Sequence, residues 1–172
     1  MNQKTRIALA LGGNLGDRLA VLTKAVRLLS DEFVTGVRVS KVYETPPWGV
    51  TDQPDFLNLV LTGDSEWKPP AILNFVKALE KELGRVPAER NGPRLVDIDL
   101  VAYGEQIWES PEVTVPHPRM HQRDFVLVPL CDVWPEWKHP RFGKTVRELL
   151  AELEKRTPAA VKVFAPPPAV VE

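Results

Sequence analysis

The order of its apolar segments limits what this chain can fold into more than any other feature. Four short apolar runs, bounded by glycine, proline or polar residues, predict β-strands at residues 6–11, 37–45, 56–62 and 95–103. Two longer segments with apolar residues every three or four positions predict helices at residues 17–30 and 69–83. The resulting order, strand–helix–strand–strand–helix–strand, is that of a ferredoxin-like α+β core. In that core an antiparallel sheet carries both helices on one face.

Alternating side chains assign the two faces of the predicted sheet, because residues two apart on a strand point to the same side. One face of the third and fourth strands is apolar, with Leu57, Leu59, Leu61, Val96, Ile98 and Leu100. The opposite face carries Phe56 and Asn58 on the third strand and Asp97 and Asp99 on the fourth. We therefore expect the helices and the core on the first face and the active site on the second.

The length of 172 residues predicts a single domain, which we place at residues 1–158. C-terminal additions to the core include a segment rich in proline, histidine and arginine at 116–123 and a helix at 145–154. The last residues, 159–172, form a proline-rich tail that we expect to be loosely held.

Charge and apolar patterning narrow the classes of function. The chain has 22 basic and 23 acidic residues, so it lacks the overall positive charge typical of nucleic-acid or membrane binding, and we expect neither partner. It also has no apolar run long enough to span a bilayer. Cys131 is its single cysteine, which favours a reducing compartment. We therefore predict a cytoplasmic protein, with a monomer as the expected state.

Asp97 and Asp99 are the residues most indicative of chemistry. They share one strand face, although aspartate is depleted in strands, and two adjacent carboxylates repel each other unless a cation lies between them. Mg²⁺ prefers oxygen ligands and is often held by one or two carboxylates together with substrate phosphates. Two surface acids on a solvent-facing strand are the alternative, but the apolar Leu95 and Val101 on the same face argue against it. We interpret the pair as a magnesium site on a nucleotide.

Two basic loops flank this acidic strand. Arg85, Arg90 and Arg94 precede it in a loop rich in glycine and proline, and Arg119 and Arg123 follow it. Guanidinium groups bind phosphate oxygens in bidentate fashion, so these loops predict a clamp on a polyphosphate. Each arginine taken alone fits a surface ion pair equally well, but five of them around one acidic strand favour the clamp.

Two further features leave alternatives open. Residues 12–16 follow a strand and open a helix, where anions can bind, but a tight turn with a helix cap explains them equally well. Phe56 and Asn58 offer a face on which a planar ring can stack and hydrogen-bond. Aromatic residues on a ferredoxin-like sheet also fit a single-stranded RNA-binding module, although Asp97 and Asp99 would repel an RNA backbone.

Together these segments resemble the 6-hydroxymethyl-7,8-dihydropterin pyrophosphokinases of folate biosynthesis. The similarity runs from Leu9 to about Leu130 and is carried by LGGNLGDR (11–18), YETPPWG (43–49), DQPDFLN (52–58), GRVPAERNGPRLVDIDL (84–100) and VPHPRMHQRDFVLVPL (115–130). The resemblance implies an ATP-dependent diphosphotransferase with a ferredoxin-like core. Such an enzyme moves the pyrophosphoryl group of ATP to the hydroxymethyl group of the dihydropterin and releases AMP.

The resemblance also implies roles for individual residues. Asp97 and Asp99 would hold two Mg²⁺ ions with ATP, and Arg85 and Arg94 would also assist the transfer. The residues expected to contact the nucleotide are Glu80, Arg85, Arg90, Arg94, Leu100, Thr114, His117 and Arg123. The residues expected around the pterin are Thr45, Pro46, Pro47, Trp48, Phe56, Asn58 and Phe125. Phe56 and Phe125 would sandwich its ring, and Asn58 would bind its polar edge. Lys77 departs from the family pattern, because some members have glutamine there.

Overall fold

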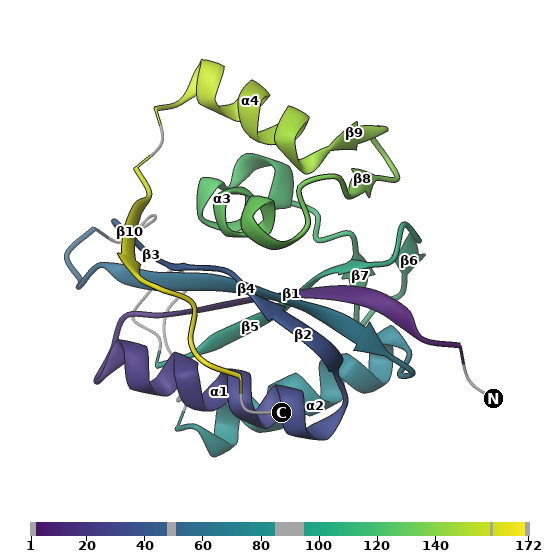
Figure 1. The fold of residues 1–172 in the computed structure, drawn as a ribbon, viewed down its shortest axis with the longest axis horizontal. Helices are drawn as coiled ribbons and strands as arrows, with labels where there is room; N and C mark the ends of the chain where they lie inside the picture. The colour runs from purple at the N-terminus through teal and green to yellow at the C-terminus, as the bar shows by residue number, and fades with distance from the viewer. Residues whose placement is uncertain (1–2, 48–50, 85–94, 159, 171–172) are drawn as a thin grey trace.

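The computed structural model describes residues 3–47, 51–84, 95–158 and 160–170 (Figure 1). Its main sheet has the strand order β10-β3-β4-β1-β5, and β2 also pairs with β4. The strands of this sheet are β1 (Thr5–Gly13), β2 (Thr35–Val39), β3 (Val42–Thr45), β4 (Phe56–Ser65), β5 (Asp97–Tyr103) and β10 (Lys162–Ala165). All of their pairings are antiparallel. The predicted α+β, ferredoxin-like core is confirmed.

Two helices, α1 (Arg18–Glu32) and α2 (Pro69–Glu82), cover one face of this sheet (Figure 1). α1 begins where the Asp17 side chain accepts a hydrogen bond from the Ala20 amide at 3.1 Å. α2 begins at Pro69, where the missing amide hydrogen costs little because the first turn has no intrahelical acceptor for it. Beneath the helices lies the apolar strand face, including Leu57, Leu59, Leu61, Val96, Ile98 and Leu100. This face was predicted correctly.

The C-terminal additions form a second layer over part of the other face (Figure 1). This layer contains a 3₁₀ helix η1 (Met120–Gln122), α3 (Asp124–Val133), β8 (Lys138–His139), β9 (Lys144–Thr145) and α4 (Val146–Arg156). The preceding strands β6 (Trp108–Glu109) and β7 (Thr114–Val115) lead into it and pack against the first core through Trp108 and Val115. Val60 and Val101 of the sheet pack with Leu127 and Leu130 of α3 in a second core. The face that an RNA-binding module would need open is therefore partly covered. The sequence did not predict α3, because Pro129 lies inside it and no side chain caps its start.

The segment predicted as one strand at 37–45 forms two, β2 and β3, so that prediction is wrong. Ser40 interrupts the strand, because its hydroxyl donates to the Lys41 carbonyl at 2.7 Å and accepts from the Val60 amide at 2.9 Å. The Lys41 amide in turn donates to Asp132 Oδ2 of α3 at 3.2 Å. The Ser40 amide still donates to the Val60 carbonyl at 2.9 Å, so the main chain leaves the ladder at Lys41, where it binds to the second layer.

The expectation of a loosely held tail is also wrong for residues 162–165. These residues form β10, which pairs with β3 at the edge of the sheet. Beyond β10 the chain passes to the side of α1, where Val170 packs against the first core (Figure 1). The tail thus extends the sheet by one strand.

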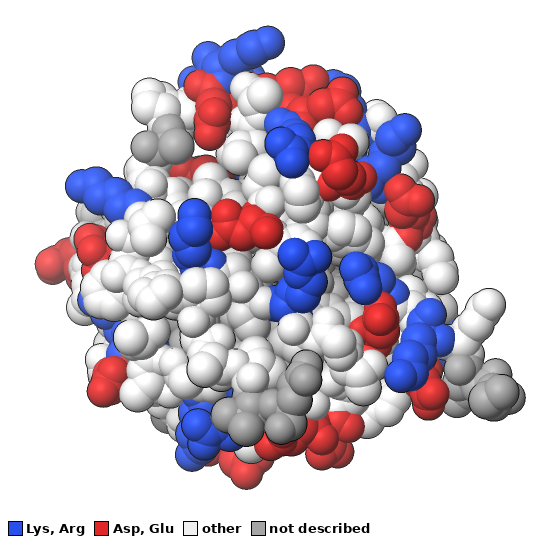
Figure 2. All heavy atoms as spheres, viewed as in Figure 1, with Lys and Arg blue, Asp and Glu red and all other residues white. Residues whose placement is uncertain are grey.

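Charges of both signs lie close together on one face of the molecule. Acidic and basic side chains are interspersed on the face shown in Figure 2, in keeping with the net charge of −1. Within the described ranges, no helix is both long and apolar enough to cross a membrane.

His139 is expected to make the stability of the folded protein depend on pH. Its ring is buried against Trp137 and Phe142, and its Nδ1 accepts a hydrogen bond from the Arg141 amide at 3.1 Å. Burial, with smaller effects of His121 and Arg141, lowers the pKa of His139 to about 4. The unfolded chain takes up this proton near the ordinary pKa of about 6.5, so stability should fall as the pH drops from 6.5 towards 4.

We expect His139 to account for a loss of up to about 3 kcal/mol across that range. Urea unfolding at pH 7.5 and pH 4.5 measures it, with His139→Gln as the comparison. The variant should be less stable than wild type at pH 7.5 and should lose less stability on acidification. Equal losses in the two proteins would show that the burial of His139 does not set this pH dependence.

Candidate active site

Gly12 of β1 lies between the two polar strands of the sheet. It pairs with Asn58 of β4 on one side and with Asp97 of β5 on the other. A Cβ atom at Gly12 would lie 2.5 Å from Asn58 Oδ1, so only glycine fits beside the present position of this amide. The register therefore joins Asn58, Gly12 and Asp97 in one row across the sheet.

Small residues continue this strip along β1. Ala10 pairs with Val60 of β4 and with Asp99 of β5. Because glycine and alanine have little or no side chain, β1 forms a low floor, a shallow strip of sheet surface with the longer polar side chains of β4 and β5 on either side. The strip has an amide on its β4 side and two carboxylates on its β5 side.

The amide side of the strip is fixed by β3. Asn58 is 8% exposed, and its Nδ2 donates to Thr45 Oγ1 at 2.8 Å. Phe56 pairs with Thr45 and is half-buried at the start of β4. Pro46 and Pro47 follow Thr45, the first exposed and the second half-buried. The structure therefore brings together five of the residues predicted around a pterin.

The carboxylate side is held at high electrostatic cost. Burial is the main cause that raises the pKa of Asp99, and the neighbouring Asp97 carboxylate raises it further. Arg123 and Lys77 lower the pKa of Asp99, while Glu80 raises it. The charged form of Asp99 is therefore less favourable in the folded protein than in water, and Arg123 and Lys77 offset only part of this effect.

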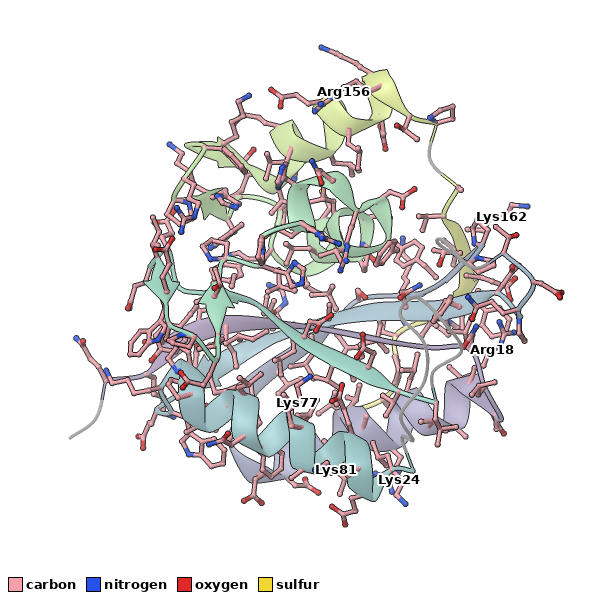
Figure 3. All side chains as sticks on the ribbon, turned by 180° about the vertical axis from the view of Figure 1, so that it is seen from behind. Arg18, Lys24, Lys77, Lys81, Arg156 and Lys162 are labelled. Atoms are coloured by element: carbon pink, nitrogen blue, oxygen red, sulfur yellow. The ribbon has the colours of Figure 1, made fainter. Side chains whose placement is uncertain are left out.

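Glu80 supports the strand from beneath. Its side chain is 1% exposed on α2, and its Oε2 accepts a hydrogen bond from the Ile98 amide at 2.7 Å. Its Oε1 lies 3.5 Å from Lys77 Nζ, one helical turn earlier. Lys77 lies on α2 beneath β5 (Figure 3). The expected nucleotide residue Glu80 is therefore also a positioning residue for the main chain between Asp97 and Asp99.

The segment from β7 to α3 lies on the other side of the carboxylates. Burial, Arg123 and Arg119 lower the pKa of His117 to about 4, while Asp97 opposes this shift. The imidazole is therefore neutral at physiological pH. The guanidinium carbon of Arg123 lies 5.6 Å from the centre of the Phe125 ring, and Phe125 packs partly against the second core.

Thr114 and Leu100, the other two described residues predicted to contact the nucleotide, lie in different surroundings from each other. Thr114 is half-buried in β7 and pairs with Glu109 of β6. Leu100 is 5% exposed, and its side chain lies in the first core, on the face opposite to Asp99. A contact between Leu100 and a nucleotide would therefore have to involve its main chain.

Several predicted residues lie outside the described residues. They are Trp48, Arg85, Arg90 and Arg94. Of the predicted phosphate clamp, Arg119 and Arg123 lie within the described residues, and both are close enough to His117 to lower its pKa. Lys77 was not predicted as part of the clamp, but with Arg123 it lowers the pKa of Asp99.

The turn at residues 12–16 acts mainly as a connector. Asp17 caps α1, and the nearly buried Asn14 donates from Nδ2 to Gln53 Oε1 at 2.9 Å and to the Pro54 carbonyl at 2.8 Å. The sequence did not indicate this role of Asn14, because its partners lie about 40 residues away. Of the two interpretations of this segment, the capped turn is the one that these contacts support.

The donor set fits a hard divalent cation that is bound together with a ligand. Among the described residues, no group of three or more His, Cys, Asp or Glu side chains is arranged to hold a metal by itself. Asp97 and Asp99 offer carboxylate oxygens alone, which suits Mg²⁺ when phosphates supply the remaining oxygens. The charge of such a cation would offset the repulsion that raises the pKa of Asp99.

A ferredoxin-like sheet with a carboxylate pair, flanking basic residues and an adjacent polar strip fits the class of nucleotide-dependent transferases. Residues 8–135 match the family described as 7,8-dihydro-6-hydroxymethylpterin-pyrophosphokinase (HPPK), and the chain belongs to this family. The predicted family, enzyme class and reaction are thereby confirmed. The reaction is pyrophosphoryl transfer from ATP to hydroxymethyldihydropterin in folate biosynthesis.

Two relatives illustrate how far the similarity extends. The chain is 37% identical over 146 residues to the 2-amino-4-hydroxy-6-hydroxymethyldihydropteridine pyrophosphokinase of Aquifex aeolicus, a match covering 85% of this chain and 91% of that protein. It is 44% identical over 154 residues to the protein of the same name from Methylorubrum extorquens, covering 87% of this chain and 94% of that one.

Solved structures support the fold. The crystal structure of wild-type Plasmodium falciparum HPPK-DHPS with pteroate matches with a TM-score of 0.73 at 16% identity. The match covers 91% of this chain but only 43% of that longer chain. The likeness therefore concerns the fold alone.

Proposed function

We propose that the strip on β1, β4 and β5 is where this chain carries out pyrophosphoryl transfer from ATP to 6-hydroxymethyl-7,8-dihydropterin. The observation that carries the proposal is the register that joins Asn58, Gly12 and Asp97 in one row. It puts an amide suited to the polar edge of a flat heterocycle next to carboxylates suited to a metal–nucleotide complex. Acceptor and donor would thus meet over the low floor of β1.

Asp97 and Asp99 would hold two Mg²⁺ ions together with ATP. The support is the shared strand face of the two carboxylates and the partial burial of Asp99. When bound, such ions stabilise negative charge on phosphate oxygens and orient the reacting groups. The two carboxylates would set the positions of the ions and therefore of the phosphate groups that the ions stabilise.

The nucleotide would lie between α2 and the segment from β7 to α3. Lys77 and Arg123 are the described basic residues that influence Asp99, and Arg123 can neutralise phosphate oxygens through its guanidinium fork. His117 is neutral, and its Nδ1 accepts a hydrogen bond from the Arg119 amide at 3.1 Å, so its Nε2–H is left to donate to the nucleotide without adding charge. Thr114, the main chain of Leu100 and the sequence-assigned Arg85, Arg90 and Arg94 complete the proposed contacts.

The pterin would lie on the β3–β4 side of the strip. Asn58 would bind the polar edge of the ring, and its bond to Thr45 holds the amide in one orientation. Phe56 and Phe125 would pack on the two ring faces. Pro46, Pro47 and the sequence-assigned Trp48 would border the pocket.

In the transfer, the pterin hydroxyl oxygen attacks the β-phosphorus of ATP. A new oxygen–phosphorus bond forms, the bond from the β-phosphorus to the oxygen shared with the α-phosphate breaks, and AMP leaves with that oxygen. The hydroxyl proton is released to solvent. Positioning and charge stabilisation account for most catalysis in such reactions, so the residues that align the two substrates matter more than a strong base.

A product assay tests this proposal. Purified protein with Mg²⁺, ATP and 6-hydroxymethyl-7,8-dihydropterin should form AMP and the pterin diphosphate in equal amounts. Formation of ADP would contradict pyrophosphoryl transfer, and the absence of any pterin-dependent AMP would contradict the assignment. A monomer in the cytoplasm, without nucleic-acid or membrane partners, remains the form in which we expect the enzyme to act.

A further inference from the structure

The C-terminal strand β10 lies outside the segment that matches the family, yet it borders the proposed pterin side of the site. It pairs along the outer edge of β3, with Lys162 opposite Glu44 and Val163 opposite Tyr43. Just before β10, the Ala160 amide donates to Asp124 Oδ2 of α3 at 3.2 Å. The strand therefore links the start of α3 to the edge of the sheet (Figure 1).

Arg18 connects β10 with two other segments. Its Nη1 donates to Glu44 Oε2 of β3 at 2.8 Å and to the Asp55 carbonyl at 2.9 Å. Its guanidinium carbon also lies 5.2 Å from the centre of the Phe164 ring of β10. Figure 3 shows Arg18 and Lys162 on the same side of the molecule, from α1 and β10. One guanidinium thus joins the start of α1, β3, the approach to β4 and β10.

Two of these contacts fall next to residues of the proposed pterin pocket. Glu44 precedes Thr45, which holds the Asn58 amide, and Asp55 precedes Phe56. A shift of Arg18 would therefore move the ends of β3 and β4 that carry Thr45 and Phe56. Phe164 limits such a shift, because its ring packs against the guanidinium and restricts the conformations open to this side chain.

We propose that Arg18 and Phe164 form a clasp that positions Thr45 and Phe56 for the pterin, and that the C-terminal strand thereby contributes to acceptor binding. The inference rests on the proposed function and deepens it. Arg18 and Phe164 are positioning residues, since neither is placed in contact with a substrate. The clasp acts on the pterin side and leaves the carboxylate side unchanged.

Phe164→Ala tests the clasp, with Val163→Ala as the matched control. Val163 is the more exposed of the two, at 62% against 45%, so truncating it perturbs β10 without removing the ring over Arg18. We expect Phe164→Ala to raise KM for the dihydropterin about fivefold while KM for ATP stays within twofold. Val163→Ala should leave both KM values within twofold of wild type. Phe164→Trp keeps an aromatic ring over Arg18, so its KM for the dihydropterin should stay close to that of wild type.

A second variant tests the clasp from the side of Arg18, in case Phe164→Ala misfolds. Arg18→Lys keeps the positive charge but loses the planar guanidinium group, so it should raise the pterin KM as Phe164→Ala does. An unchanged pterin KM in both variants, a parallel rise of both KM values, or the same change in Val163→Ala would each overturn the clasp. Turnover by the wild-type enzyme distinguishes a failure of the clasp from a failure of the proposed function. If the wild-type enzyme forms AMP and the pterin KM is unchanged in Phe164→Ala and Arg18→Lys, only the clasp is rejected. If the wild-type protein does not bind the pterin, the clasp and the proposed function are both rejected.

Discussion

Asp99→Asn is expected to lower kcat/KM by about a thousandfold, because it removes one of the two carboxylates that would anchor the metal–nucleotide complex. The same change should leave the metal-free protein as stable as wild type or more stable. Burial and Asp97 raise the pKa of Asp99, which means that the charged carboxylate lowers the free energy of unfolding. Steady-state kinetics at saturating Mg²⁺, with thermal unfolding in EDTA, would measure both effects.

Asp64→Asn provides the matched control. Asp64 is also an aspartate of the central sheet, but it pairs with Arg6 near the start of β1, at the far end of the strand from Gly12. We expect its activity to stay within twofold of wild type. If Asp99→Asn kept near-wild-type activity, or if it lost activity only by unfolding, the proposed metal role of the pair would be wrong.

Gly12→Ala is expected to lower kcat/KM for the dihydropterin about 10- to 100-fold. The new Cβ would lie 2.5 Å from Asn58 Oδ1, so the amide must rotate and give up its 2.8 Å bond to Thr45. A misplaced amide loses one hydrogen bond to the substrate, which accounts for this size of effect. The atoms that the Cβ would meet belong to Asn58 and Leu57, so KM for ATP should change little.

Gly63→Ala separates this local effect from general damage to the sheet. At Gly63 a Cβ would lie 2.3 Å from Val34 Cγ1 and 2.9 Å from the Thr35 carbonyl, so that variant must shift main chain and lose stability. Its folded fraction should keep the wild-type pterin KM. The opposite pattern, with an unchanged pterin KM in Gly12→Ala, would show that Asn58 does not bind the acceptor.

Local patterns in the sequence are sufficient to predict the core of this fold. The alternation through Leu57, Leu59 and Leu61 assigned the face that packs under α1 and α2, and the same rule put Asp97 and Asp99 on the other face. These predictions succeed because each depends only on neighbours along one strand. The resemblance then supplied the reaction, which composition and spacing alone left open.

Features that depend on distant contacts could not be predicted in this way. The position of Gly12 between Asn58 and Asp97 follows from strand register, and the roles of Asn14 and Arg18 follow from contacts with residues 53–55. α3 carries a proline in its interior, and β10 follows a segment whose composition is typical of a loose tail. In each case tertiary packing outweighs the local signal.

A crystal structure of the complex with Mn²⁺, a non-hydrolysable ATP analogue and the dihydropterin would test the central claim most directly. Anomalous scattering locates Mn²⁺ without ambiguity from water. We expect two metal peaks within coordination distance of the Asp97 and Asp99 carboxylates, with the pterin ring against Asn58 and its hydroxyl group directed at the β-phosphorus. An ordered analogue with no metal on either carboxylate, or a pterin bound away from Asn58, would contradict the account.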